Sequence, residues 1–316
     1  MTAAAAPLAS DDEFRFLAFD ARRVGRAGPL PAVARIAVDV ADHRAVSGLA
    51  FDGGLPPEIV ALHGAGLNAH SFDPTLLALG RPALALDLPG HGRSDWRSDG
   101  DYRPDALAAD VVEVLERVAR RPVTLLGHSL GGLTAALVAA MRPDLVRRVI
   151  LVDITPGVSP ARDTGSVREF IQGQRDFSSI DEIVQRAQRF GIGHERAALE
   201  RGIALNTRLR PDGRLEWAHH LAHLEPAPRT DDGEEAQPYA PIWGALERLR
   251  SLDVPVALIA ADAGILSRQH ITEWEDRLPS SAVVTIHGSH NLHEAAPLRL
   301  AEVLDGLHAK RSDAAT

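Results

Sequence analysis

The sequence of 316 residues contains no cysteine, which excludes disulfides, thiolate metal sites and a cysteine nucleophile in one step. Long apolar runs are also missing, because none reaches the roughly 20 residues that a bilayer-spanning helix needs. The first ten residues carry no Lys or Arg ahead of an apolar segment, so they do not resemble a signal peptide. We therefore expect a cytoplasmic protein, although the lack of cysteine says nothing about the compartment.

Positive charge is scarce relative to negative charge. The chain has 34 Lys and Arg residues against 43 Asp and Glu residues, a net charge of -9. A surface of that sign repels phosphate groups, so neither nucleic acid nor an anionic membrane is an expected partner. Hydrophobic residues make up 45% of the sequence and charged residues 24%, which argues against disordered and fibrous proteins and is typical of a globular one.

Short apolar runs alternate with helical patterns along most of the chain. This alternation predicts an α/β fold, in which a mostly parallel sheet is covered by helices on both faces. The runs that fit buried strands are residues 58–62, 83–86, 123–126, 149–153, 256–260 and 283–286. Apolar residues at helical spacing mark residues 104–120, 133–141, 267–278 and 297–308.

Residues 155–249 lack this strand pattern and contain amphipathic helical stretches such as residues 179–190. We interpret residues 155–249 as a helical cap, inserted into a core made of residues 31–154 and 250–316. Residues 1–30 are interrupted by Pro and Gly, and we expect them to form a loosely ordered extension.

The strongest chemical signal is the run Gly-His-Ser-Leu-Gly-Gly at 127–132, between a predicted strand and a predicted helix. Strand, G-x-S-x-G and helix in this order expose a nucleophilic serine, here Ser129. At the two glycines of the motif a Cβ would clash in the sharp turn that holds the serine in a strained conformation. The turn also places the backbone N–H of Leu130 at a helix N-terminus, where it can stabilise an oxyanion.

Two further loops follow predicted strands. His63-Gly64-Ala65-Gly66 stands where a second oxyanion donor is needed, and the N–H of Ala65 is our candidate. We interpret His63 as a structural histidine that hydrogen-bonds the loop. The Pro and Gly content of residues 87–94 indicates a tight turn, in which His91 and Arg93 are expected to tie loops together.

Four motifs now stand in sequence order: His-Gly at 63–64, Asp-Leu-Pro-Gly-His-Gly-Arg-Ser at 87–94, the serine motif at 127–132, and Gly-Ser-His-Asn-Leu-His at 288–293. Together they resemble the α/β-hydrolase family. The resemblance implies a doubly wound, mostly parallel sheet of eight strands, with a helical cap after the sixth strand. It also implies hydrolysis of an ester, lactone, thioester or similar bond through a covalent acyl-enzyme. The cap is the least transferable part, so the substrate does not follow from the resemblance.

The resemblance places the general base at His290, in the loop after the last predicted strand. A histidine there can accept the proton of Ser129 and return it to the leaving group. His287 is too close to the strand end for this role. His293 matches a recurrent histidine three residues past the base, for which we expect a structural role.

The acid of the triad has two candidates. The family commonly carries Gly-x-x-Asp after the seventh strand, whereas this chain has Ala-Asp-Ala-Gly at 261–264, so Asp262 is an imperfect match. The other position used in the family is the end of the sixth strand, where Asp153 stands in an apolar frame that would bury it. A buried carboxylate needs a partner, and an imidazolium can be that partner. We favour Asp153 and keep Asp262 as the alternative.

These assignments predict a cofactor-independent serine hydrolase that cleaves a carboxylic ester or lactone of a small, largely apolar molecule. No metal-ligand spacing and no phosphate-binding loop occurs in the sequence, so neither a cofactor nor a metal is expected. Aromatic residues of the predicted cap are candidates to line an apolar acyl pocket, namely Phe170, Phe177, Phe190, Trp217 and Trp243.

Other functions remain open. The same machinery could hydrolyse a C–C bond, or the chain could be a ligand-binding protein that keeps the fold with a silent triad. A cofactor-free peroxidase or an acyltransferase would use the same residues. In each enzymatic case we expect a small-molecule substrate, and a monomer or a homodimer.

Overall fold

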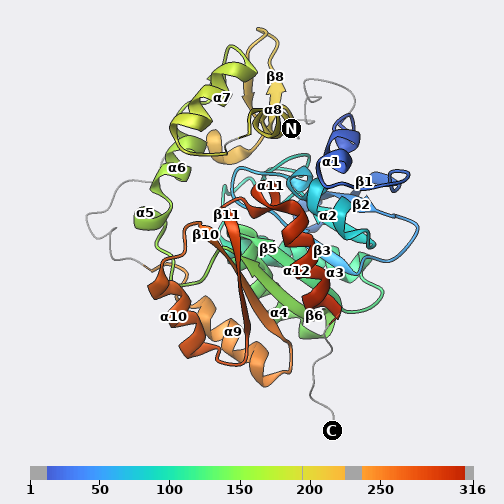
Figure 1. Ribbon diagram of the computed structural model, residues 1–316, viewed down its shortest axis with the longest axis vertical. Coiled ribbons are helices and arrows are strands. Elements are labelled where there is room, and N and C mark those ends of the chain that lie inside the picture. The colour runs from blue at the N-terminus through green and yellow to red at the C-terminus, as the bar shows by residue number, and fades with distance from the viewer. Residues whose placement is uncertain (1–12, 194, 225–236, 310–316) are drawn as a thin grey trace.

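The computed structural model describes residues 13–193, 195–224 and 237–309. An eight-stranded sheet in the order β1-β2-β4-β3-β5-β6-β10-β11 runs through the core (Figure 1). Its strands are β1 (Val33–Val40), β2 (Arg44–Phe51), β3 (Ile59–Leu62), β4 (Ala83–Leu86), β5 (Val123–His128), β6 (Val146–Val152), β10 (Val256–Ala263) and β11 (Ala282–Ser289). β2 pairs antiparallel with β1 and β4, and the other neighbours pair parallel. The predicted eight-stranded, mostly parallel sheet is confirmed.

Two hydrophobic clusters cover the two faces of this sheet. Along β6, Val149 and Leu151 belong to one cluster, while Ile150 and Val152 belong to the other, which explains the continuous apolar run of that strand. The first face carries α3 (Pro104–Val118), α4 (Leu130–Met141), α9 (Ile242–Ser251) and α10 (Arg268–Arg277). The second carries α1 (Leu17–Arg23), α2 (Asp73–Leu79), α11 (Leu292–Ala295) and α12 (Pro297–Ala309).

All six predicted strands are present, as β3 to β6, β10 and β11, but β1 and β2 were not predicted. β1 is an edge strand in which Arg35 and Asp39 interrupt the apolar residues, and most of its side chains are only partly buried. A search for continuous apolar runs finds strands that are buried on both faces, so it does not find a strand of this kind.

Residues 155–224, which follow β6, form a separate group of elements in the upper part of Figure 1. They are α5 (Pro160–Asp163), α6 (Gly165–Gln172), β7 (Asp176–Phe177), α7 (Ile180–Arg189), α8 (Arg196–Asn206), β8 (Thr207–Leu209), β9 (Leu215–Trp217) and the single turn η4 (His220–Ala222). The three short strands make a small antiparallel sheet that the sequence did not predict, because two or three residues are too few for a strand pattern. We call residues 155–224 the cap.

Two predicted boundaries differ from the structure. Helix α9, which the sequence analysis placed in the cap, packs in the core, where the rings of Trp243 and Trp274 lie 5.9 Å apart. Helix α1, which we expected to be loosely attached, buries Leu17 and Ala21 in the second core cluster. Residues 1–12 of the predicted extension and 310–316 of the predicted core lie outside the described residues.

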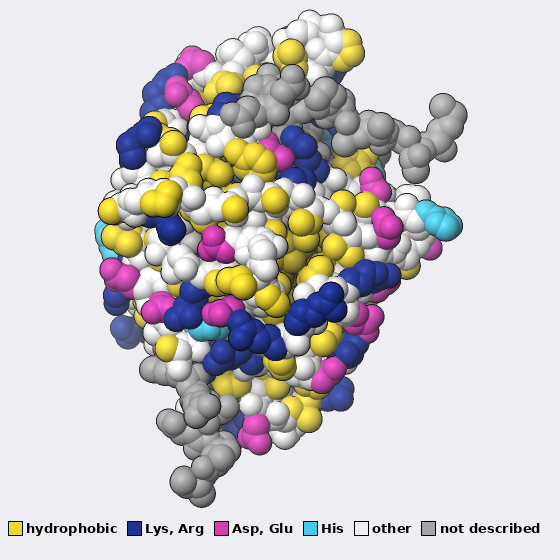
Figure 2. Space-filling model, turned by 90° about the vertical axis from the view of Figure 1, so that its right-hand side faces the viewer, with side chains coloured by type: hydrophobic (Ala, Val, Ile, Leu, Met, Phe, Trp, Pro, Cys, Tyr) yellow, Lys and Arg dark blue, Asp and Glu magenta, His cyan; other side chains and the backbone are white. Residues whose placement is uncertain are grey.

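Charged side chains of both signs share the face of the molecule seen in Figure 2. Arg side chains alternate there with Asp and Glu side chains, so the negative net charge does not gather into one acidic patch on this face. Of the helices in the described part of the chain, none has the length and apolar character that crossing a membrane would require.

Candidate active site

Ser129 lies at the turn between β5 and α4, with φ of 51° and ψ of -122°. Its backbone N–H donates to Val152 O at 3.1 Å, which fixes the turn against β6. A Cβ on Gly127 would lie 2.2 Å from Gly131 O, and one on Gly131 would lie 2.2 Å from Leu62 O. Both glycines are therefore required for the turn to close, and the half-buried Ser129 is held in a conformation that L-residues rarely adopt.

His290, in the loop after β11, contacts Asp153, which follows β6. The distance between His290 Nδ1 and Asp153 Oδ2 is 2.8 Å, and the carboxylate is fully buried. Asp153 also accepts hydrogen bonds from the backbone N–H groups of Ala261 and Ile265, each at 3.0 Å. A Cβ on Gly264 would lie 2.1 Å from Asp153 Oδ2, so the chain after β10 wraps tightly around this carboxylate. The buried charge thus has three donors.

Asp262, the alternative acid, points elsewhere. Its carboxylate accepts from the Gly288 N–H at 2.9 Å and contacts His287 Nδ1 at 2.7 Å. These contacts hold the pKa of Asp262 below its usual range. The structure therefore brings Asp153, the acid favoured by the sequence analysis, to His290, and not Asp262.

The two loop histidines join the loops around the serine. Each accepts a backbone N–H at Nε2: His63 from Leu88 at 2.9 Å, and His91 from Gly66 at 3.1 Å. Each then donates from Nδ1 to a nearby carbonyl oxygen, at 2.8 Å for His63 and 3.0 Å for His91. Burial lowers the pKa of both rings, so they remain neutral. Their predicted role as structural ties is confirmed.

The loop that carries Ala65 passes directly over the serine. A Cβ on Gly64 would lie 2.8 Å from His128 Nδ1 and 3.2 Å from Ser129 Cβ, so a side chain there would force these neighbours to shift. Leu130 is the first residue of α4, where the backbone N–H has no preceding helical turn to bond. The two candidate oxyanion donors therefore stand on segments that flank Ser129.

Sequence reasoning missed His128, which it treated as the variable position of the serine motif. The ring is buried, and its Nε2–H donates to His290 O at 3.0 Å, so it holds the backbone of the histidine loop. Burial, with the neighbouring rings of His290 and His293, holds the pKa of His128 well below its ordinary value. The sequence feature that could have identified His128 is its position directly before the serine. His293 is likewise buried, with a ring 4.7 Å from that of His128.

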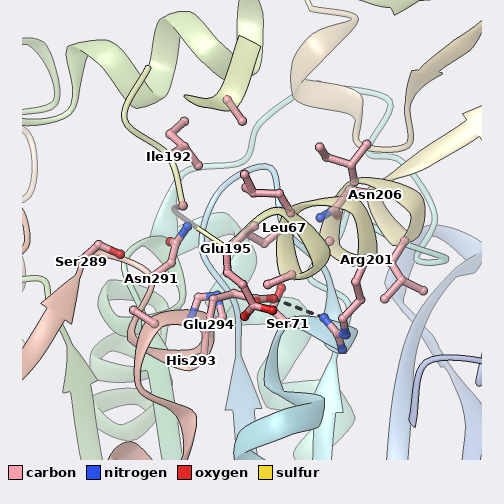
Figure 3. Close-up of a pocket in the computed structure, with 18 of the residues that line it drawn as sticks. Leu67, Ser71, Ile192, Glu195, Arg201, Asn206, Ser289, Asn291, His293 and Glu294 are labelled. Atoms are coloured by element: carbon pink, nitrogen blue, oxygen red, sulfur yellow. Dashed lines mark hydrogen bonds and ion pairs between the residues drawn. The ribbon is translucent and has the colours of Figure 1, made fainter. Parts of the chain in front are cut away.

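A cavity of about 570 Å³ adjoins these residues, between the cap and the core (Figure 3). Its lining includes Gly66, next to Ala65, and Ser289 and Asn291, which flank His290. Ser129 and His290 themselves lie just outside this lining. From the cap side it includes Phe170 and Trp217.

The other three aromatic candidates do not line this cavity. Phe177 is buried behind Trp217, with ring centroids 5.3 Å apart, in the core of the cap. Phe190 packs edge-on against Phe170, and Trp243 belongs to the main core. Aromatic composition alone does not distinguish a pocket wall from the packing behind it. The described residues contain no group of three or more His, Asp or Glu side chains placed to hold a metal ion.

A family model of the alpha/beta hydrolase fold matches residues 57–297. The chain belongs to the α/β-hydrolase family. Within this family it is similar to a Mycobacterium tuberculosis protein named Esterase Rv0045c, with 33% identity over 305 residues, 94% of this chain and 95% of the relative. A solved structure of that esterase aligns with a TM-score of 0.80 and 31% identity, and covers 95% of this chain and 99% of that one.

A second α/β-hydrolase relative is the sn-1-specific diacylglycerol lipase ABHD11 of Mus musculus. It is 27% identical over 260 residues, which cover 76% of this chain and 77% of the relative.

Proposed function

We propose that the chain is a serine esterase, which hydrolyses a carboxylic ester or lactone of a small, largely apolar substrate through an acyl-enzyme. The observation that carries the proposal is the 2.8 Å contact between His290 and the buried Asp153. The backbone oxygen of His290 is bonded by His128, the residue before the serine of the strand-turn-helix elbow. Similarity to proteins named as an esterase and as a diacylglycerol lipase supports the same class of reaction.

In the proposed mechanism Ser129 Oγ attacks the substrate carbonyl carbon, while its proton passes to His290 Nε2. Asp153 accepts the hydrogen bond from His290 Nδ1, which leaves Nε2 as the basic nitrogen and stabilises the imidazolium. The backbone N–H groups of Ala65 and Leu130 hold the oxyanion.

The tetrahedral intermediate then collapses, and His290 gives its proton to the leaving alcohol oxygen. Water, deprotonated by His290, attacks the acyl-enzyme in the same way. The products are a carboxylic acid and regenerated Ser129.

The apolar character of the substrate is supported by the cavity beside the site. Phe170 and Trp217 form part of its wall, and its volume lies in the range of small-molecule pockets. No feature of the described residues favours C–C bond hydrolysis or a silent site over ester hydrolysis.

The test is labelling by a fluorophosphonate together with hydrolysis of p-nitrophenyl butyrate. We expect labelling at Ser129, and a loss on the order of 10⁴-fold or more in kcat for Ser129→Ala. Ser251→Ala, at an exposed serine that ends α9, is the matched control and should keep full activity. If no ester is hydrolysed and Ser129 is not labelled, the esterase proposal fails. Labelling with turnover of a β-diketone but of no ester would replace it with C–C hydrolysis.

A further inference from the structure

The cavity continues directly from the loop that carries Ala65. Residues 66–68 line it on the core side, and Ser289 and Asn291 line it on either side of His290. In the proposed mechanism Ala65 N–H binds the carbonyl oxygen, which belongs to the acyl part of an ester. On this ground we infer that the acyl group enters this cavity.

Arg201, a cap residue on the cavity lining, is completely engaged with acceptors of the core. Its Nε contacts Asp20 at 2.7 Å, its Nη1 contacts Glu294 at 3.3 Å, and its Nη2 contacts Asp73 at 3.1 Å and His70 O at 2.8 Å. The side chain is 1% exposed. Figure 3 shows it reaching from α8 toward the carboxylates at the cavity floor. Each nitrogen of this guanidinium thus already has an acceptor in the core.

Arg23, the other arginine on the lining, is engaged in the same way. Its Nε contacts Glu195 at 3.2 Å, while Nη1 and Nη2 contact the side chain and backbone oxygen of Glu294 at 3.3 and 2.6 Å. On the lining, two guanidiniums are thus paired with two carboxylates, those of Glu195 and Glu294, and the carboxylates of Asp20 and Asp73 lie buried behind it. Burial raises the pKa of Asp20 to about 6; the carboxylates of Asp73 and Glu294 add to the rise and Arg201 opposes it.

The histidines on the lining offer no free cation either. His70 Nδ1 contacts Asp73 at 2.8 Å, and His287 Nδ1 contacts Asp262 at 2.7 Å. Burial lowers the pKa of His293 to about 3, so its ring carries no charge at neutral pH.

Neutral polar side chains on the lining include those of Ser71, Ser289, Asn291 and Asn206, and the orientation of the Asn206 amide is fixed. Asn206, at the end of α8, accepts a hydrogen bond at Oδ1 from Asn68 Nδ2 at 2.8 Å, and Asn68 is itself held by Leu205 O at 2.7 Å. This contact fixes which end of the Asn206 amide is the donor. Among the described residues, none accepts a hydrogen bond from Asn206 Nδ2. In Figure 3 the side chain lies at the cavity, near Leu67.

We propose that the cavity is a charge-selective acyl pocket, which accepts uncharged acyl groups, including those with an amide or other hydrogen-bonding substituent, and excludes acyl groups that carry a carboxylate. A carboxylate entering it would meet the carboxylates of Glu195 and Glu294 and no unpaired cation. A neutral acceptor would meet the N–H donors of Asn206. This inference rests on the proposed esterase function.

Three p-nitrophenyl esters of equal chain length test the proposal: pentanoate, glutaramate and glutarate. They differ in the end of the acyl group, which is a methyl, an amide or a carboxylate. Rates are corrected with the Ser129→Ala variant, because a terminal carboxylate can assist the spontaneous reaction. We expect kcat/KM for glutaramate to exceed that for glutarate by at least about tenfold. A smaller ratio overturns the proposal.

Two variants assign the effect to the cavity. Glu195→Gln removes a rim charge and should raise kcat/KM for glutarate relative to pentanoate by roughly threefold or more. Glu200→Gln, further along the same segment and paired with Arg196 outside the cavity lining, is the matched control and should leave that ratio unchanged. Equal effects of both variants would mean that the overall charge of the protein, and not this cavity, discriminates.

Asn206→Leu, of similar volume, should lower kcat/KM for glutaramate relative to pentanoate, and an unchanged ratio overturns the role of Asn206. The two failures are distinguishable. If no ester is hydrolysed and Ser129 is not labelled, the esterase proposal fails; if pentanoate is hydrolysed and glutarate is hydrolysed equally well, the charge selection alone fails.

Discussion

Two histidine–aspartate pairs stand three residues apart at the end of β11, and their contact distances are almost equal. His290 and Asp153 are 2.8 Å apart, and His287 and Asp262 are 2.7 Å apart. The side chains of the first pair are 16% and 0% exposed, whereas those of the second are 96% and 43% exposed. Distance therefore does not separate a candidate triad pair from a surface ion pair. Burial and position relative to the serine distinguish the two pairs.

The environment of each carboxylate explains the difference in expected role. Asp153 receives two backbone N–H groups besides the histidine, so it is held in one orientation without solvent. A carboxylate that orients the histidine of a triad has to be fixed in this way. Asp262 is open to water, and ion pairs in such surroundings are worth little.

The most direct test of the difference between the two pairs is to neutralise each acid in turn. Asp153→Asn should lower kcat on the order of 10⁴-fold, because the amide favours the wrong histidine tautomer. Asp262→Asn should stay within about twofold, because its histidine does not reach the serine. Steady-state hydrolysis of p-nitrophenyl butyrate at equal folded concentration measures both. A large loss for Asp262→Asn with little loss for Asp153→Asn would reverse the assignment.

A second prediction moves the buried carboxylate without changing its charge. The added methyl of Gly264→Ala meets Asp153 Oδ2 at 2.1 Å, so the carboxylate or the loop must shift. A displacement of about 1 Å can cost on the order of 10²-fold in kcat. Gly306→Ala, in α12 with no atom within 4 Å of the new methyl, is the control and should keep full activity. Full activity of Gly264→Ala would show that the close fit around Asp153 is not needed.

The smallest expected effect is that of His293 on the free energy of unfolding in acid. Burial, and the charges of His290 and Arg201, lower the pKa of His293 from 6.5 to about 3 in the folded chain. Between these values the unfolded chain binds a proton that the folded chain does not, so acidification favours unfolding. From pH 6.5 to 5 this one site lowers the free energy of unfolding by about 2 kcal/mol.

His293→Gln should therefore reduce the loss of stability between pH 6.5 and 5, as measured by urea unfolding at both values. Comparing the two pH values within each variant cancels the packing effect of the substitution. His287→Gln, at an exposed side chain, is the control, and it should lose as much stability between pH 6.5 and 5 as the parent chain does. An equal loss in the parent chain and His293→Gln would show that this ring does not stay neutral when folded.

Much of the fold and part of the site could be predicted from local pattern. The glycines around Ser129 and the apolar run before it reflect local sterics, and the run of β6 reflects burial on both faces. The choice between Asp153 and Asp262 could not be made in this way. Asp153 follows β6, and Asp262 lies near the end of β10. The difference arises at this end of β10, where the N–H groups of Ala261 and Ile265 donate to Asp153 while Asp262 stays exposed.

Tertiary packing also explains why helices α9 and α1 lie elsewhere than the sequence analysis predicted. Trp243 belongs to an amphipathic helix, and its contact with Trp274 and the membership of Leu246 and Leu249 in the main cluster show that this helix lies in the core. Helix α1 has seven residues, too few for a convincing pattern, and it is held by the contact of Asp20 with Arg201, distant in sequence. Such long-range pairs leave no periodic signal.

The ion pairs of Arg201 with the core also affect how this enzyme could be re-engineered. Its guanidinium belongs to the cap, but three of its acceptors are carboxylates supplied by α1, α2 and α11 of the core. A cap taken from another hydrolase would leave these carboxylates with one fewer counter-charge, at a cost of several kcal/mol. Grafting a new cap onto this scaffold would therefore call for replacing Asp20, Asp73 and Glu294 in the same step.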